Sequence, residues 1–100
     1  MPSEGKKAGP VLRSGELALA ALDAIREDNP DKEIAVVDHG SYLRVEAEGG
    51  LILRRQTVEE FLGRPFAMQE LEFALTAFSG KIEVGEDFMR WYFRSDGEPR

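Results

Sequence analysis

Turn-forming residues divide this chain into short segments, and that division is the strongest constraint on its fold. They fall between the apolar segments at Asn29-Pro30, Gly49-Gly50, Gly63-Arg64-Pro65 and Ser79-Gly80. Each point interrupts a helix or strand, because glycine favours turns and the residue before a proline disfavours helical backbone. A chain of 100 residues cut in this way predicts one domain of short elements around one core.

The first segment with a helical period covers residues 16–28. A β-prone stretch, Pro10–Arg13, precedes it, and Ser14 is a suitable N-cap. Asn29-Pro30 ends the predicted helix. The apolar residues that recur at helical spacing are Leu17, Ala18, Ala21, Leu22 and Ile25.

Strict alternation of apolar and polar residues in Tyr42–Glu48 predicts a strand with one face in the core. A strand-like segment, Glu33–Asp38, comes before it, and Leu51–Arg55 follows the Gly49-Gly50 turn. Near the end of the chain, residues 81–84 and 88–94 predict a hairpin around Gly85-Glu86-Asp87.

Two helices are predicted between these groups of strands. Thr57 and Glu60 have the spacing of a capping box, and the short helix they open ends at Gly63. A second helix covers residues 67–78. Its core stripe is Met68, Leu71, Leu75 and Phe78, and the neighbouring stripe is Gln69, Glu72, Phe73 and Thr76.

The predicted order is therefore β-α-β-β followed by β-α-β-β, with the second helix broken at Gly63-Pro65. Because every helix is amphipathic and every hairpin has an apolar face, we expect an α+β fold with helices packed on antiparallel sheet. Residues 10–94 form its single domain. Residues 1–9 are expected to be a flexible arm and residues 95–100 a flexible tail.

The composition excludes several kinds of active site. The chain has no Cys and one His, His39, so cysteine nucleophiles, thiolate metal sites and disulfides are excluded. The acidic pairs are Glu59-Glu60 and Glu70/Glu72. Their positions are better explained by the first turns of two helices, where a negative side chain interacts favourably with the helix dipole, than by acid–base or metal chemistry. No nucleotide-binding glycine motif occurs. We expect no catalytic residue, no metal and no cofactor.

Charge and hydropathy also limit the partners. Thirteen basic and nineteen acidic residues give a net charge of −6, which repels nucleic acid and anionic lipid. No apolar run approaches the roughly 20 residues of a membrane helix, and the first residues do not resemble a signal peptide. We expect a cytoplasmic protein that is a monomer when free.

Four stretches together resemble the effector proteins of bacterial multicomponent monooxygenases, also called coupling or regulatory proteins. The resemblance covers residues 9–94 and is strongest to the toluene/alkene monooxygenase group. The stretches are GPVLRSGEL, DNPDKEIAVVD, YLRVEAEGGLILRRQTVEE and FLGRPFAMQELEFALTAFSGKIEVGEDFMRWYF.

The resemblance implies a fold of two β-α-β-β halves and a protein without a cofactor. It implies binding to a separate diiron hydroxylase and an effect on the rate, coupling and regiospecificity of O2-dependent hydroxylation of aromatic or alkene hydrocarbons. It also implies that the end of the 67–78 helix faces the hydroxylase. The expected partner-binding residues are Gln69, Glu72, Phe73, Ala74, Thr76, Ala77 and Phe78.

Two alternatives stay open at this point. Phe73 is either an exposed residue that a partner covers or a core residue under the Arg64-Pro65 turn. The protein itself is either such an effector or a small-molecule-binding regulatory domain that acts as an oligomer.

Overall fold

The computed structural model describes residues 6–93, which form three helices and seven strands. In chain order the elements are β1 (Lys7–Arg13), α1 (Glu16–Asp28), β2 (Ala35–Asp38), β3 (Tyr42–Glu48), β4 (Gly50–Arg54), α2 (Arg55–Leu62), α3 (Met68–Ala74), β5 (Leu75–Ser79), β6 (Lys81–Val84) and β7 (Phe88–Tyr92).

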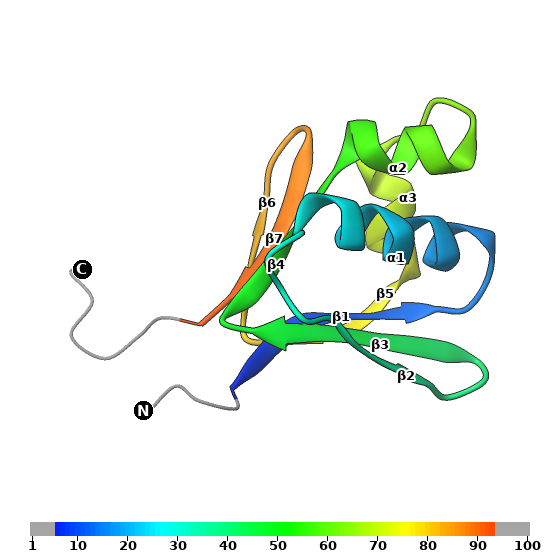
Figure 1. Cartoon of the computed structure of the whole chain (residues 1–100). Coiled ribbons are helices and arrows are strands. Elements are labelled where there is room, and N and C mark those ends of the chain that lie inside the picture. Colours follow the sequence, from blue (N-terminus) through cyan, green and yellow to red (C-terminus); the bar gives the residue numbers. More distant parts are fainter. Residues whose placement is uncertain (1–5, 94–100) are drawn as a thin grey trace.

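The strands form two antiparallel sheets, and the helices lie in the angle between them (Figure 1). The four-stranded sheet has the order β2-β3-β1-β5, and the three-stranded sheet has the order β4-β7-β6. This is the expected α+β arrangement of helices on antiparallel sheet. The first sheet contains strands from both halves of the chain, because β5 pairs with β1.

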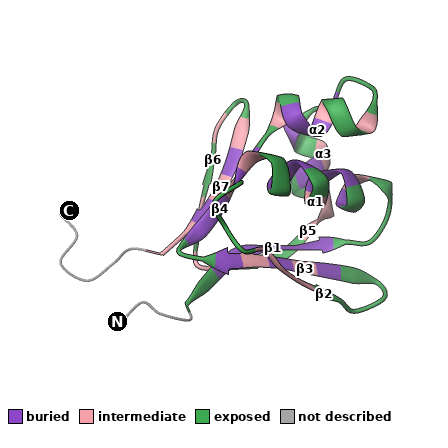
Figure 2. Ribbon diagram, in the orientation of Figure 1, coloured by how far each residue is buried: buried purple, intermediate pink, exposed green. Residues whose placement is uncertain are grey.

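Residues with a buried side chain line the surfaces where helices and sheets meet (Figure 2). The alternation predicted for β3 is confirmed, since Leu43, Val45 and Ala47 are buried and their neighbours are not. The bounds of α1 are also as predicted. The largest fully buried side chains include Trp91, Leu12, Ile25, Leu53 and Leu71.

The helix predicted for residues 67–78 is the main error. It ends at Ala74, and Leu75–Ser79 form strand β5. Leu75 pairs with Leu12 and Phe78 with Pro10 across β1. The apolar residues do recur at helical spacing. However, the backbone N–H and C=O groups of Leu75–Ser79 form their hydrogen bonds with the open edge of β1 rather than within a helix. The second half is therefore β-α-α-β-β-β.

Strand β1 begins at Lys7 rather than at Pro10. Lys7 pairs with Glu48, and Ala8 pairs with Ala47 and is fully buried. The expected arm of residues 1–9 thus included three residues of a strand. Residues 1–5 of that arm, and the expected tail of residues 95–100, lie outside the described residues.

The predicted caps of two helices are wrong. The N-cap of α1 is Gly15, not Ser14. Helix α2 begins at Arg55, so Thr57 is inside it and nearly buried. The Thr57 hydroxyl donates to Oδ1 of Asp28 (2.8 Å), and the N–H of Arg54 donates to Oδ2 of the same carboxylate (2.9 Å). A carboxylate at the end of α1 therefore binds the start of α2.

The buried side chain of Asn29 joins the end of α1 to β4. Its Nδ2 donates to the carbonyl oxygens of Ile25 (2.6 Å) and Ile52 (2.7 Å), and its Oδ1 accepts from the Ile52 N–H (3.0 Å). The residue that ends the helix before Pro30 thus also fixes the helix against the second sheet.

Strand β1 lies between β3 and β5, and Gly9-Pro10 occupies its middle. Its pairing with β3 runs through Ala8 and resumes at Val11, which fits the missing N–H of proline. A Cβ on Gly9 would collide with the carbonyl oxygen of Val45 on β3. Glycine at this position therefore permits the close approach of the two strands.

We predict that Gly9→Ala lowers the free energy of unfolding by about 3 kcal/mol, because the added methyl group overpacks two backbones. Gly40→Ala is the matched control. Gly40 has φ 89° and open space around it, so its substitution should cost only about 1 kcal/mol of left-handed strain. Urea unfolding of both variants measures the difference, and equal losses would contradict this account of β1.

Candidate functional site

Helix α3 and strand β5 contain all seven residues predicted to bind a partner. The chain reaches them through a sharp break. Helix α2 ends at Leu62, and Gly63 directly after it is in the left-handed conformation (φ 76°, ψ 20°), which is a common way for a helix to end. The linker then runs through Pro65 and Phe66 into α3.

Helix α3 is held to the core on one side. Phe66 just before it is 4% exposed, Met68 is 7% exposed and Leu71 is fully buried. A helix of seven residues has little stability of its own. The position of α3 therefore depends on these three buried side chains and on the linker that joins it to α2.

The opposite side of α3 is exposed. Gln69 and Glu72 are exposed, and the Phe73 side chain is 82% exposed. This exposure shows that a core position for Phe73 under the Arg64-Pro65 turn is wrong. Ala74, at the end of the helix, is half-buried.

The other three predicted residues lie on β5, not on the same helix. Thr76 is at an irregularity in the pairing with β1, where its hydroxyl donates to the Val11 carbonyl (3.1 Å). Ala77 pairs with Val11 and Phe78 with Pro10, so the two side chains point to opposite faces of the sheet. Phe78 is 42% exposed, so its expected core position is wrong.

A surface hollow of about 480 Å³ lies between the start of α3 and the turn that joins β6 to β7. Gln69 and Glu72 line it from the helix, and Gly85–Asp87 line it from the turn. Phe66 and Met68 contribute apolar surface. Two of the predicted residues thus border a concave surface.

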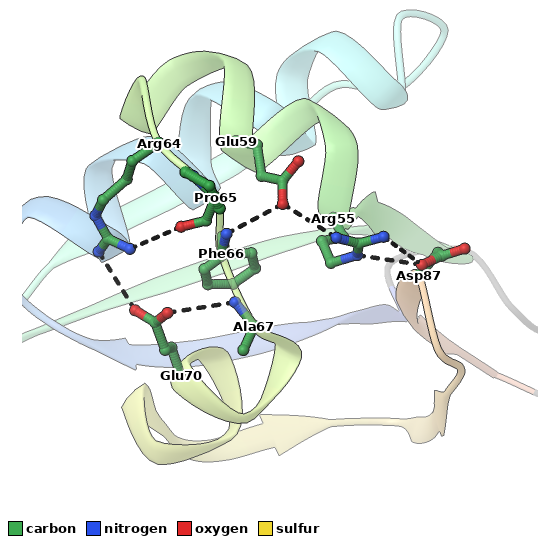
Figure 3. A network of polar contacts seen from close by, with 8 residues as sticks. All are labelled: Arg55, Glu59, Arg64, Pro65, Phe66, Ala67, Glu70 and Asp87. Atoms are coloured by element: carbon green, nitrogen blue, oxygen red, sulfur yellow. Dashed lines mark hydrogen bonds and ion pairs between the residues drawn. The ribbon is translucent and has the colours of Figure 1, made fainter.

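Two carboxylates hold the linker between α2 and α3 (Figure 3). Oε2 of Glu59 accepts from the Phe66 N–H (3.0 Å) and from Nη1 of Arg55 (3.1 Å). The two oxygens of Glu70 accept from the Ala67 N–H and from Nη2 of Arg64, each at 3.3 Å. Consecutive backbone amides of the linker are therefore bound by different helices.

Arg55 extends this network to the second sheet. Its Nε and Nη2 donate to Oδ1 of Asp87 at 3.1 and 2.9 Å, and its backbone N–H donates to the Asp87 carbonyl (2.8 Å). The pKa of Arg55 lies above its ordinary value, chiefly because Asp87 accepts these bonds and adds its charge. The α2 start and the β6–β7 turn are thus tied together.

Sequence reasoning missed most of this network. It placed Glu59 and Glu60 in the first turn of α2, but that turn contains no acidic residue because the helix begins at Arg55. Glu70 is in the first turn of α3 as expected. The spacing of Arg55 and Glu59, four residues apart on one helix, was the available signal for that pair.

The described residues contain no group of three or more His, Cys, Asp or Glu side chains that could hold a metal ion. None of the helices in residues 6–93 has the length and hydropathy of a membrane span. The exposed residues of α3 and β5 are a mixture of apolar, small and polar side chains.

Comparison with known proteins assigns the chain to a family. The model of the MmoB/DmpM family matches residues 6–92. The chain belongs to the MmoB/DmpM family. The match spans nearly all the described residues, from the start of β1 to the end of β7.

Two relatives give the family assignment more detail. The effector subunit of the alkene monooxygenase system of Xanthobacter autotrophicus is 39% identical over 87 residues, which are 87% of this chain and 86% of the relative. The stimulatory component DmpM of phenol 2-monooxygenase from Pseudomonas sp. is 38% identical over 77 residues, which are 77% of this chain and 83% of the relative.

Solved structures share the MmoB/DmpM fold seen here. A chain in a structure of the phenol hydroxylase–regulatory protein complex has a TM-score of 0.74 and 26% identity, and the match covers 88% of this chain and 99% of that one. The soluble methane monooxygenase regulatory protein B has a TM-score of 0.67 at 17% identity, covering 94% of this chain and 70% of that one. The second likeness concerns the fold alone.

We predict that the Ala67 amide titrates with Glu70 at a midpoint below 4.5. The pKa of Glu70 lies below that ordinary value because the Ala67 N–H and then Arg64 bond the charged carboxylate. These bonds contribute stability above the unfolded pKa, and the contribution is lost as the pH falls through the lower folded pKa.

An NMR pH titration of the Ala67 amide measures this midpoint. Arg64→Ala should raise it, because one of the two groups that favour the charged form is removed. A midpoint at or above 4.5 in the unmodified protein would show that Glu70 does not hold the linker in solution.

Proposed function

We propose that this chain is the non-catalytic effector protein of a multicomponent monooxygenase. It binds the diiron hydroxylase component and modulates the rate, coupling and regiospecificity of O2-dependent hydroxylation or epoxidation of aromatic or alkene hydrocarbons. The observation that carries this proposal is the 39% identity to an alkene monooxygenase effector subunit over 87% of the chain.

The alternative of an oligomeric small-molecule regulator has less support. Both relatives described above are accessory components of monooxygenases, one an effector subunit and the other a stimulatory component. A chain with the same role needs a surface for its hydroxylase and no active site of its own. We propose that it has no cofactor, that it is cytoplasmic and that it is a monomer when free.

We propose that the hydroxylase binds the exposed side of α3 and β5. Phe73 supports this proposal, because a phenylalanine that is 82% exposed leaves a large apolar surface in water. The neighbouring small residues Ala74, Thr76 and Ala77 permit a helix of the partner to approach closely. Gln69 and Glu72 are exposed on the same helix as Phe73, and Phe78, whose side chain points to the sheet face opposite Ala77, completes the proposed surface at the edge strand β5.

Phe73 is the proposed anchor of the interface. Aromatic side chains that fill a pocket at an interface centre often account for about 2 kcal/mol or more of the binding free energy. The same side chain contributes little to folding, since it is almost fully exposed in the free protein. Binding and stability are thus separable at this position.

We predict that Phe73→Ala changes the free energy of unfolding by less than about 0.5 kcal/mol but weakens hydroxylase binding about thirtyfold. Calorimetric titration of the purified hydroxylase and product formation in the reconstituted oxygenase measure the effect. Phe61→Ala is the matched control, since Phe61 is 46% exposed on α2. Full activation by Phe73→Ala at wild-type concentration would place the interface elsewhere.

We predict that Ala77→Arg folds normally and loses hydroxylase activation, because bulk and charge are added where close approach is expected. Ala77 is a cleaner position than Thr76, whose hydroxyl bonds the Val11 carbonyl. Ser41→Arg, at an exposed position outside the strands, controls for the added charge. Thermal denaturation and turnover are measured for both variants, and equal turnover would remove β5 from the proposed surface.

A further inference from the structure

We propose that Glu59 is a positioning residue for the partner-binding helix α3. Its carboxylate fixes the linker at Phe66, and the linker sets the direction in which Phe73 is presented. This inference rests on the function proposed above, because it concerns the same surface, but Glu59 itself lies on α2 and outside that surface.

The position of Glu59 suits this role. A single oxygen, Oε2, accepts both from the Phe66 N–H and from Arg55, at 3.0 and 3.1 Å (Figure 3). The Glu59 side chain is only 27% exposed, so these bonds are partly shielded from water. Hydrogen bonds to a charged acceptor are stronger than neutral ones, and the Arg55 guanidinium is itself held by Asp87.

The linker controls α3 because the helix has few other attachments at its start. Its N-cap, Ala67, has no side-chain oxygen, so the only side chain of α3 that bonds this end of the described helix is Glu70, at 3.3 Å from the Ala67 nitrogen. Phe66 is bound directly before this cap, and Phe73 lies in the last turn of the helix seven residues later. A shift at Phe66 therefore tilts the short helix and moves the Phe73 side chain.

Glu70 and Arg64 form a second attachment of the same linker, but a more exposed one. Their side chains are 42% and 47% exposed, and the bonds to Ala67 and Arg64 are longer, at 3.3 Å. Glu59 is therefore the stronger of the two attachments. Its neighbour Glu60 is exposed and has no side-chain partner in the part of the chain that is described, so it is a matched control of equal charge.

The first test uses the free protein. Amide hydrogen exchange of α3 should accelerate about tenfold in Glu59→Ala, while exchange in α1 stays as in wild type. Glu59→Gln should restore most of the protection, because its amide oxygen still accepts from the Phe66 N–H. Unchanged α3 exchange in Glu59→Ala, or no rescue by Gln, would overturn the proposal, as would an equal effect of Glu60→Ala.

The second test measures coupling to the partner surface. Glu59→Ala should weaken hydroxylase binding about tenfold in the wild-type background and by much less in the Phe73→Ala background. Such non-additivity in a double-mutant cycle indicates that Glu59 acts through Phe73. Equal losses in both backgrounds would overturn the positioning role.

The two proposals fail in different ways. If wild-type protein does not bind the hydroxylase at all, the proposed function is wrong, and the exchange measurement on the free protein still decides the role of Glu59. If wild type binds and Phe73→Ala weakens binding but Glu59→Ala does not, only the positioning role is wrong.

Discussion

The pairing of β1 on both of its edges is the interaction on which the rest of the structure depends. β3 from the first half pairs with one edge, and β5 from the second half pairs with the other. Because β5 must reach that edge, helix α3 ends at Ala74. Thr76–Phe78 then lie along the outer strand of the four-stranded sheet. The same pairing therefore completes the core and places the proposed partner surface.

The short helix α3 is fixed at both ends by different forces. At its end, β5 is bonded to β1, and at its start Glu59 and Glu70 bond consecutive linker amides. Buried Leu71 holds the middle. An exposed aromatic side chain can then be presented in one direction without a large helix to support it, which reduces the entropy lost when a partner binds.

The sequence predicts correctly those elements in which the pattern of apolar residues matches the pattern of buried side chains in the structure. β3 alternates strictly and is half-buried, and α1 has both a helical period and the Asn29-Pro30 stop. The prediction from sequence is wrong at β5. The spacing of Leu71, Leu75 and Phe78 fits a helix, but Leu75–Ser79 form a strand because they pair with the open edge of β1. For the proposed site, the sequence left two alternatives for Phe73, an exposed position and a core position, and the structure has the exposed one. The Glu59 bond to Phe66 joins elements whose contact no local pattern shows.

Hydrogen exchange of the complex tests the central claim most directly. Purified hydroxylase in excess should slow exchange across α3 and β5, in peptides that cover residues 68–79, and leave β2 and the β2–β3 turn as in the free protein. That footprint would establish the surface around Phe73 as the contact with the hydroxylase. Protection confined to β2 and β3, with α3 exchanging as fast as in the free protein, would contradict it.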